Sequence, residues 1–215
     1  MLTKLSNSKF LIPIMAVVVI SATGLGFYIS LKQSQNRLEQ NTATQDLFWP
    51  NPKQINDFNS KDHDNKDFGL KQMSGKWSFV FFGYTNCPDI CPITMSVMAD
   101  VYQKIVDEFE NVQIIFITVD PERDTANKLS SYVSYFHKDF IGIHSELENE
   151  NNLIKQIGIA YFYNKEDEKY LVDHSASIFI IDPKMRLIAK LSPPHQSETI
   201  IDKFKNIKRF IDEKN

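Results

Sequence analysis

Cys87 and Cys91 are the two cysteines of this 215-residue chain, and both lie in the segment GYTNCPDICP. Each is followed by a proline. A structural disulfide between them would close a very short loop and would constrain little of the unfolded chain. Residues about one turn apart can still reach the Cα separation of a disulfide, which permits reversible redox chemistry. Two thiolates at this spacing can equally face one soft metal ion, so the cysteines alone leave both chemistries open.

Both sulfurs are expected near the start of a helix. Pro92 would lose a backbone hydrogen bond and clash with a carbonyl inside a helix, so we predict that it is the first helical residue. Residues 87–90 would then form a turn that places Cys87 beside Cys91. The partial positive charge at a helix N-terminus favours thiolate over thiol, and the pair should therefore be reactive.

His174, in the segment YLVDHSASIFIIDP, is the candidate for a third metal ligand, because two cysteines alone do not enclose an ion. It precedes a predicted strand that begins at Ala176. A neutral imidazole beside two thiolates would form a Cys2His set, which suits Cu(I) and can adapt to Cu(II) with one more ligand. Asp173 could orient the ring. A lone histidine is more often an ordinary residue at a strand edge, so the residues by themselves leave this role open.

The apolar pattern after residue 55 predicts alternating buried strands and helices. The predicted strands are 77–84, 112–119, 140–143, 176–182 and 186–191, and the predicted helices are 92–110, 125–137, 148–157 and a last one from 197. A β-α-β-α start followed by a hairpin and a closing helix is the thioredoxin-like arrangement, an α/β fold of three layers with a central mixed sheet. We predict this domain over residues 56–215. The cysteines would follow a buried strand and begin a helix, where open α/β sheets place reactive groups.

Residues 10–31, FLIPIMAVVVISATGLGFYISL, contain no charged residue and are long enough as a helix to cross a hydrocarbon layer of about 30 Å. We predict one transmembrane anchor here, preceded by a short cytoplasmic N-terminus over residues 1–9. Residues 32–55 are polar, lack a sustained period and are predicted to be a tether.

The short N-terminal segment contains no arginine and leaves no room for an Arg-rich mitochondrial presequence. This favours a single-pass protein of the bacterial inner membrane, with its C-terminal domain in the periplasm. In such an oxidising compartment, a thiol pair stays reduced only if a reductant acts on it or a metal occupies it.

Three segments in this order, FFGYTNCPDICP, VDPERDT and DHSASIFIIDP, behind a single membrane anchor, resemble the Sco/SenC family of copper-binding, thioredoxin-fold assembly factors for cytochrome c oxidase. By pattern, the resemblance covers roughly residues 55 to 212. It implies that Cys87, Cys91 and His174 are copper ligands. The chain departs from the family in two places: Met185 stands where the family often has glycine in a turn, and SKDHDNKDFG lacks the usual shape of the family's N-terminal hairpin.

The resemblance also implies a function. The protein would be a copper metallochaperone that delivers copper to the binuclear CuA site of cytochrome c oxidase subunit II. Other copper carriers and thiol–disulfide reductants are further candidate partners. The alternative is a thiol–disulfide oxidoreductase that uses Cys87 and Cys91 as a redox pair to reduce the CuA cysteines. A peroxidase ranks third, because peroxiredoxins want threonine three residues before the attacking cysteine, and Pro88 stands there before Cys91.

Other features have simpler interpretations. In VDPERDT, Asp120 and Pro121 are expected to turn the chain, and Asp124 or Thr125 to cap a helix, which we favour over partner docking by Arg123. Met95 and Met98 have the spacing of core residues on a helix. His63 stands in an acidic segment that we expect to be solvated. The formal net charge of −3, without a long basic run, argues against nucleic acid as a partner.

Overall fold

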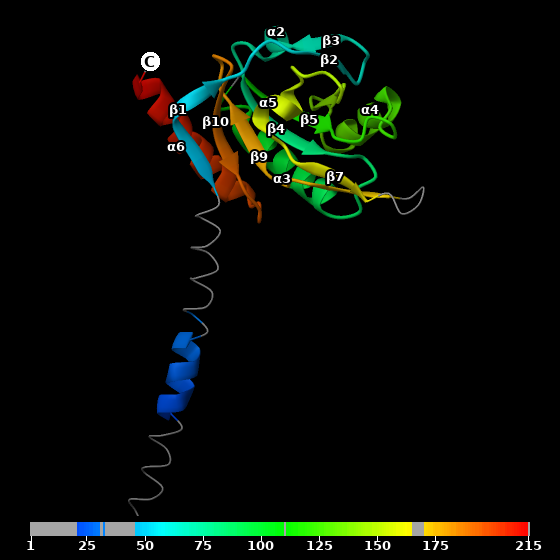
Figure 1. Cartoon of the computed structure of the whole chain (residues 1–215). Helices are drawn as coiled ribbons and strands as arrows, with labels where there is room; N and C mark the ends of the chain where they lie inside the picture. Colours follow the sequence, from blue (N-terminus) through cyan, green and yellow to red (C-terminus); the bar gives the residue numbers. More distant parts are fainter. Residues whose placement is uncertain (1–20, 31, 33–45, 110, 165–169, 215) are drawn as a thin grey trace, which may run out of the picture. The chain divides into compact units, whose positions relative to one another are not determined.

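The computed structural model describes residues 21–30, 32, 46–109, 111–164 and 170–214 (Figure 1). The chain divides into two compact units, residues 1–44 and 45–215. Residues 21–30 of the first unit are helical, while the rest of the predicted anchor over 10–31, and the segment 1–9, lie outside the described residues. Within the described part, no helix combines the length and the apolar character needed to cross a bilayer.

An eight-stranded mixed sheet forms the centre of the second unit, in the order β1-β10-β9-β4-β5-β6-β2-β3 (Figure 1). Strand β4 pairs in parallel with β5, and β5 with β6, while the other neighbours pair antiparallel. Its strands are β1 (Leu47–Gln54), β2 (Asn59–Asp62), β3 (Asp67–Gly69), β4 (Trp77–Gly83), β5 (Val112–Thr118), β6 (Ile141–His144), β9 (Ile178–Ile181) and β10 (Arg186–Leu191). The predicted central mixed sheet is confirmed.

The helices of this unit are α2 (Leu70–Met73), α3 (Ile90–Ile105), α4 (Ala126–Phe136), α5 (Leu153–Ile157) and α6 (Ser197–Lys214). Every residue of β4 and β5 is buried, as unbroken apolar runs predict for strands covered on both faces. Helices α3 and α4 supply the crossovers that the parallel strand pairs require. Phe204 of α6 packs edge-on against Trp77 and Phe79 of β4, so the last helix covers the core beside the central strand.

Strand β1 occupies the C-terminal part of the segment predicted as a tether over residues 32–55. It pairs with β10, its Phe48 ring meets the Phe210 ring of α6 at 5.1 Å between centroids, and Trp49 packs against the core. The pairing shifts register between Phe48 and Lys53, so the segment shows no regular alternation of apolar and polar residues. Residues 33–45 of the predicted tether lie outside the described part of the chain.

Helix α3 begins at Ile90, after Asp89, so Pro92 is the third helical residue and the prediction that it is the first is wrong. The first four N–H groups of a helix have no partner within it, so a proline at this position costs no helical hydrogen bond. Cys91 therefore lies within the first turn of the helix. The helix also ends at Ile105, earlier than predicted.

The two departures from the family pattern are both turns of hairpins. Strands β2 and β3 form a hairpin within SKDHDNKDFG, where Asp62 Oδ1 accepts hydrogen bonds from two backbone N–H groups of the turn. Met185 stands between β9 and β10 with a φ of 61°, in the left-handed region that favours glycine. Its side chain is buried, and Asp182 holds this turn through backbone N–H groups and the Arg186 side chain.

We expect the domain boundary to be visible as a difference in stability. A chain that begins at residue 45 keeps β1, whereas a chain that begins at residue 56 exposes the edge of β10 and the ring of Phe210. Because burying one large apolar side chain stabilises a fold by about 1.5–3 kcal/mol, and the shorter chain lacks both the buried Ile55 and the partly buried Trp49, it should lose about 3 kcal/mol of unfolding free energy. Urea denaturation of the two chains measures the difference, and equal midpoints would show that β1 is not part of the folded unit.

Candidate metal centre

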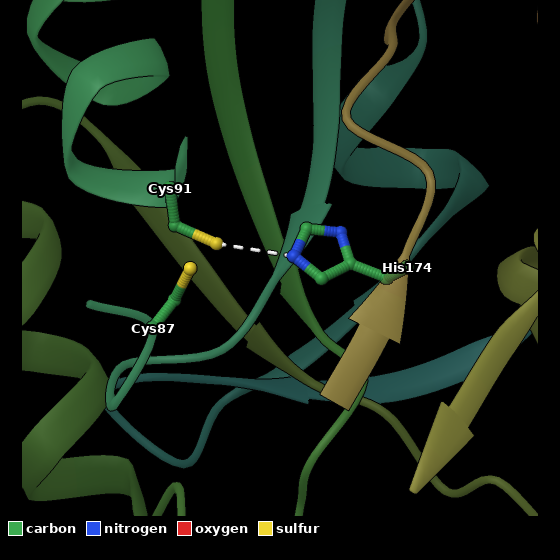
Figure 2. Close-up of side chains that lie close together, drawn as sticks. All are labelled: Cys87, Cys91 and His174. Atoms are coloured by element: carbon green, nitrogen blue, oxygen red, sulfur yellow. Dashed lines mark hydrogen bonds between the residues drawn. The ribbon is translucent and has the colours of Figure 1, made fainter. Parts of the chain in front are cut away.

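Cys87, Cys91 and His174 converge at one place on the domain (Figure 2). Their potential ligand atoms, two Sγ and one imidazole nitrogen, all lie within 4.8 Å of one another. Cys91 Sγ is 3.2 Å from His174 Nε2. Figure 2 shows the two sulfurs side by side, with the imidazole pointing toward them from a strand end. The structure thus brings together the three residues that the sequence nominates as ligands.

The cysteine loop follows directly from the central strand β4. The Cys87 backbone N–H donates to the Tyr84 carbonyl at 3.2 Å, which closes a turn before α3 begins. Cys91 is fully buried, and Cys87 is half-buried. One sulfur is therefore enclosed by the core, while the other is partly open to solvent.

Gly83, the last residue of β4, gives the Cys91 sulfur its space. A Cβ at this position would lie 2.8 Å from Cys91 Sγ and 2.9 Å from Phe116 Cε2. Side chains do not approach a Cβ so closely, so any larger residue would displace the sulfur or the ring. The absence of a side chain at the end of β4 therefore leaves the space that the Cys91 thiol occupies.

His174 is the last residue of β8 (Leu171–His174), which pairs only with β7 (Tyr161–Asn164) in a two-stranded sheet within the described residues. The prediction placed this histidine just before a strand that begins at Ala176, whereas His174 ends a strand of its own and β9 begins at Ile178. Rings of Phe81 and Tyr84 meet the imidazole edge-on, at 6.1 and 5.8 Å between centroids. The hairpin was missed because its strands are only four residues long and their sequences, YFYN and LVDH, do not alternate between apolar and polar residues.

The tautomer of His174 follows from its surroundings. Its Nδ1 lies 3.1 Å from the Ser175 carbonyl oxygen, which can only accept a hydrogen bond. The ring proton therefore belongs on Nδ1, and Nε2 directs a lone pair toward the sulfurs, as a metal ligand must. Asp173, which was expected to orient the ring, has an exposed position next to His174 in β8, and the carbonyl takes that role instead.

The two thiols have opposite proton affinities. A hydrogen bond from Cys91 lowers the pKa of Cys87 to about 3, against the opposing effect of burial. Burial raises the pKa of Cys91 far above its usual range, and the neighbouring Cys87 sulfur raises it further. The metal-free, reduced site is therefore a thiolate at Cys87 that accepts a hydrogen bond from the thiol of Cys91. Binding of a metal ion by both sulfurs must release the Cys91 proton.

The loop between β5 and α4 carries the VDPERDT segment and holds the cysteine loop in place. Asp124 is fully buried, and its carboxylate accepts hydrogen bonds from Thr118 Oγ1, Thr85 Oγ1 and the Thr85 backbone N–H. Thr125 caps α4 by accepting from the Lys128 N–H, which agrees with the predicted capping role. Burial raises the pKa of Asp124, although the three hydrogen bonds oppose the rise. Asp124 thus supports the segment that carries Cys87, a role that the sequence did not reveal.

The remaining candidates lie outside this cluster. Met95 and Met98 are fully buried on α3, which confirms that they belong to the core. His63 accepts a hydrogen bond from the Gly142 N–H through Nδ1 and is half-buried. Among the described residues, the cysteine and histidine cluster is the group of three or more possible ligands that the structure assembles.

A family model described as SCO1/SenC matches residues 50–209. The chain belongs to the SCO1/SenC family. The human mitochondrial protein SCO2 homolog is 33% identical over 166 residues, which are 74% of this chain and 60% of that protein. Family membership confirms the resemblance that the three sequence segments carry.

Solved structures of relatives have the same fold. The crystal structure of Arabidopsis thaliana ScoI with copper bound superposes with a TM-score of 0.67 at 31% identity, over 72% of this chain and 97% of that one. Yeast Sco1 with copper bound gives a TM-score of 0.64 at 28% identity, over 72% and 88%. The thioredoxin-like fold predicted from the order of elements is thus confirmed for this domain.

We expect Gly83→Ala to damage the site and the core together. The added methyl group must push Cys91 Sγ or the Phe116 ring aside, so the variant should lose about 1–3 kcal/mol of unfolding free energy and bind a soft metal ion more weakly. Gly142→Ala is the matched control, because its Cβ would crowd Val133 and Leu129 at 3.2 and 3.3 Å, away from the sulfurs. Urea denaturation and Cu(I) competition titration compare the two, and equal copper affinities would contradict the argument.

We also expect Cys87 to react as a thiolate in mildly acidic solution. Because its pKa is lowered to about 3, the thiolate stays almost fully populated as the pH falls from 8 to 5, and half of it is protonated only at about pH 3. Alkylation of the reduced, metal-free protein should therefore keep a nearly constant rate over that range, whereas an ordinary cysteine slows about tenfold per pH unit. Cys91→Ser weakens the main cause of the shift and should restore a pH dependence. A rate for the unaltered protein that falls tenfold per unit would refute the assignment.

Proposed function

We propose that this protein is a membrane-anchored copper metallochaperone that delivers copper to the CuA site of cytochrome c oxidase subunit II. The observation that carries the proposal is the convergence of Cys87, Cys91 and His174 within 4.8 Å on the fold of copper-bound relatives. The Sco family is a family of cytochrome c oxidase assembly proteins, which supports the oxidase as the destination. The apolar span over residues 10–31 supports an anchor in a bacterial inner membrane, with the domain in the periplasm.

The donor set suits copper in its reduced state. Two sulfurs and one imidazole nitrogen form a soft, three-coordinate set, which favours Cu(I), and Cu(II) would need a further ligand. The site is lined by Phe81 and Tyr84 on the histidine side. Aromatic rings around a site disfavour a large net charge. Two thiolates with one Cu(I) would carry a net charge of −1, which equals the charge of the metal-free site with a thiolate at Cys87 and a thiol at Cys91.

Loading would begin at Cys87, which is half-buried and already ionised. Cys91 then exchanges its proton for the metal ion, and the proton leaves to solvent. His174 completes the set through Nε2, because its Nδ1–H is held by the Ser175 carbonyl. Delivery reverses this order by ligand exchange: thiolates and imidazoles of the recipient replace the three ligands one at a time, so the ion is never free.

A thiol–disulfide oxidoreductase is the second candidate, because Cys87 is a half-buried thiolate beside a thiol. In that reaction, the Cys87 thiolate attacks a disulfide of the oxidase subunit and releases one partner thiolate. Cys91 then gives up its proton and attacks the mixed disulfide, which leaves a Cys87–Cys91 disulfide and a fully reduced partner. A dithiol reductant must return two electrons to this protein before the next cycle.

Copper loading tests the ligand set. The reduced domain should bind about one Cu(I), and X-ray absorption at the copper edge should show two sulfurs and one nitrogen. His174→Ala should remove the nitrogen and weaken binding by more than the roughly 10- to 100-fold loss caused by removing a residue that supports a metal ligand. Asp173→Ala is the control on the same strand and should leave the spectrum unchanged. A domain that stays metal-free after reduction and loading would refute the proposal.

Oxidase assembly in cells separates the two candidate functions. A metallochaperone needs all three ligands, so His174→Ala should lose oxidase activity as severely as Cys87→Ser. If His174→Ala keeps full activity while Cys87→Ser abolishes it, copper binding is incidental and thiol–disulfide exchange is the essential reaction.

A further inference from the structure

We propose that Arg123 is a positioning residue for His174: with Asp120 and Tyr170, it fixes the hairpin of β7 and β8 so that the imidazole meets the sulfurs. The inference rests on His174 as a copper ligand, as proposed above. It assigns to Arg123 a role inside the protein rather than at a partner surface.

The guanidinium of Arg123 joins the loop after β5 to the base of β8. Its Nε donates to Asp120 Oδ2, and its Nη1 donates to the Tyr170 carbonyl at 2.8 Å. Its Cζ lies 3.6 Å from the centroid of the Tyr170 ring, while the Tyr170 hydroxyl donates to Asp120 Oδ1 at 2.8 Å. Tyr170 is thus held at its ring, its hydroxyl and its backbone, four residues before His174. We call Asp120, Arg123 and Tyr170 the clamp.

The hairpin depends on such contacts because it stands apart from the central sheet. Strands β7 and β8 form a sheet of their own. Phe162 and Leu171 on the hairpin are exposed, which leaves its outer face without an apolar cover in the described structure. Besides the clamp, the Tyr163 hydroxyl donates to the Val119 carbonyl at 2.7 Å, again in the loop after β5. Val172 of β8 is also buried in the core, so these contacts to the loop add to that anchor and help to set the position of the strand end that carries His174.

The same loop fixes the other half of the site. Asp124, one residue after Arg123, holds the backbone and hydroxyl of Thr85 in the cysteine segment. One donor of Arg123 is left without a partner: Nη2 is buried and makes no hydrogen bond among the described residues. A buried donor left unpaired weakens a fold, so this geometry serves the placement of the hairpin better than it serves stability.

Arg123→Lys and Tyr170→Phe test the clamp. Lysine keeps the charge but cannot hold Asp120 and the Tyr170 carbonyl together, and phenylalanine removes only the hydroxyl. In the reduced, metal-free full chain, both variants should speed hydrogen exchange at the amides of Leu171–His174. Both should also weaken Cu(I) affinity by roughly tenfold, as expected when a residue that supports a ligand is removed.

Arg186→Lys is the matched control. Arg186 pairs with Asp182 in the turn between β9 and β10, and the exposed fractions of the two side chains are 24% and 1%, against 18% and 1% for Arg123 and Asp120. The same chemical change at the same burial should lower stability to a similar extent without changing exchange in β8 or copper affinity.

A double-mutant cycle separates positioning from general damage. If Arg123 acts through His174, Arg123→Lys should have no further effect on copper affinity in a His174→Ala background. An equal loss in both backgrounds, or unchanged exchange in β8, would overturn the inference. If His174→Ala alone leaves copper binding intact, the proposed ligand set fails, and the exchange measurement on the metal-free chain still decides whether the clamp holds the hairpin.

Discussion

The contact between Cys91 Sγ and His174 Nε2 joins two segments that are 83 positions apart in the sequence, and the whole site depends on it. No local structure brings these atoms together. The sulfur is placed by the end of β4 and the first turn of α3, and the imidazole by a hairpin that follows α5. A distance of 3.2 Å between them therefore requires the central sheet, the loop after β5 and the hairpin to be correct at once. The fold as a whole therefore holds the imidazole beside the two thiols.

The two cysteines differ in burial, and this difference gives their thiols different protonation states. Cys87 accepts a hydrogen bond from Cys91 and is only half-buried, so its sulfur can carry a negative charge and meet an incoming ion or disulfide. Cys91 lies in the core between the end of β4 and the rings around it, so its charge is costly without a metal ion, and it keeps a proton. Under the proposed function, copper bound at this site would relieve this cost, and its departure would restore the proton. Copper affinity should then fall as acidity rises, which would couple transfer to the protonation of a single buried thiol.

The sequence predicted the parts of this site that depend on local pattern. The buried run before Cys87 predicts β4, the spacing after Cys91 predicts α3, and the three segments predict the family. The parts that depend on long-range packing escaped prediction. The segment before residue 55 forms β1 because it can pair with the edge of β10. The hairpin that carries His174 shows no clear alternation of apolar and polar residues that would predict its strands. The partner of His174 Nδ1 is a backbone carbonyl of Ser175, which no side-chain pattern can reveal, so Asp173 was the natural but mistaken choice.

The attachments of the three proposed ligands differ in strength, and under the proposed function this difference affects which of them can release the ion first. Both cysteines stand on the cysteine loop and α3, which continue from the fully buried strand β4, and Asp124 holds this loop through Thr85. His174 stands on a two-stranded hairpin whose ties to the body include the buried Val172, the Arg123 guanidinium stacked on Tyr170 and a few hydrogen bonds. Moving a hairpin against such contacts costs less than shifting a strand within an eight-stranded ladder. Under the proposed function, the imidazole is therefore the ligand that the fold can withdraw first, which would leave copper on two sulfurs, open on one side to the ligands of a recipient. A site built wholly on the central sheet would then be expected to release the ion more slowly.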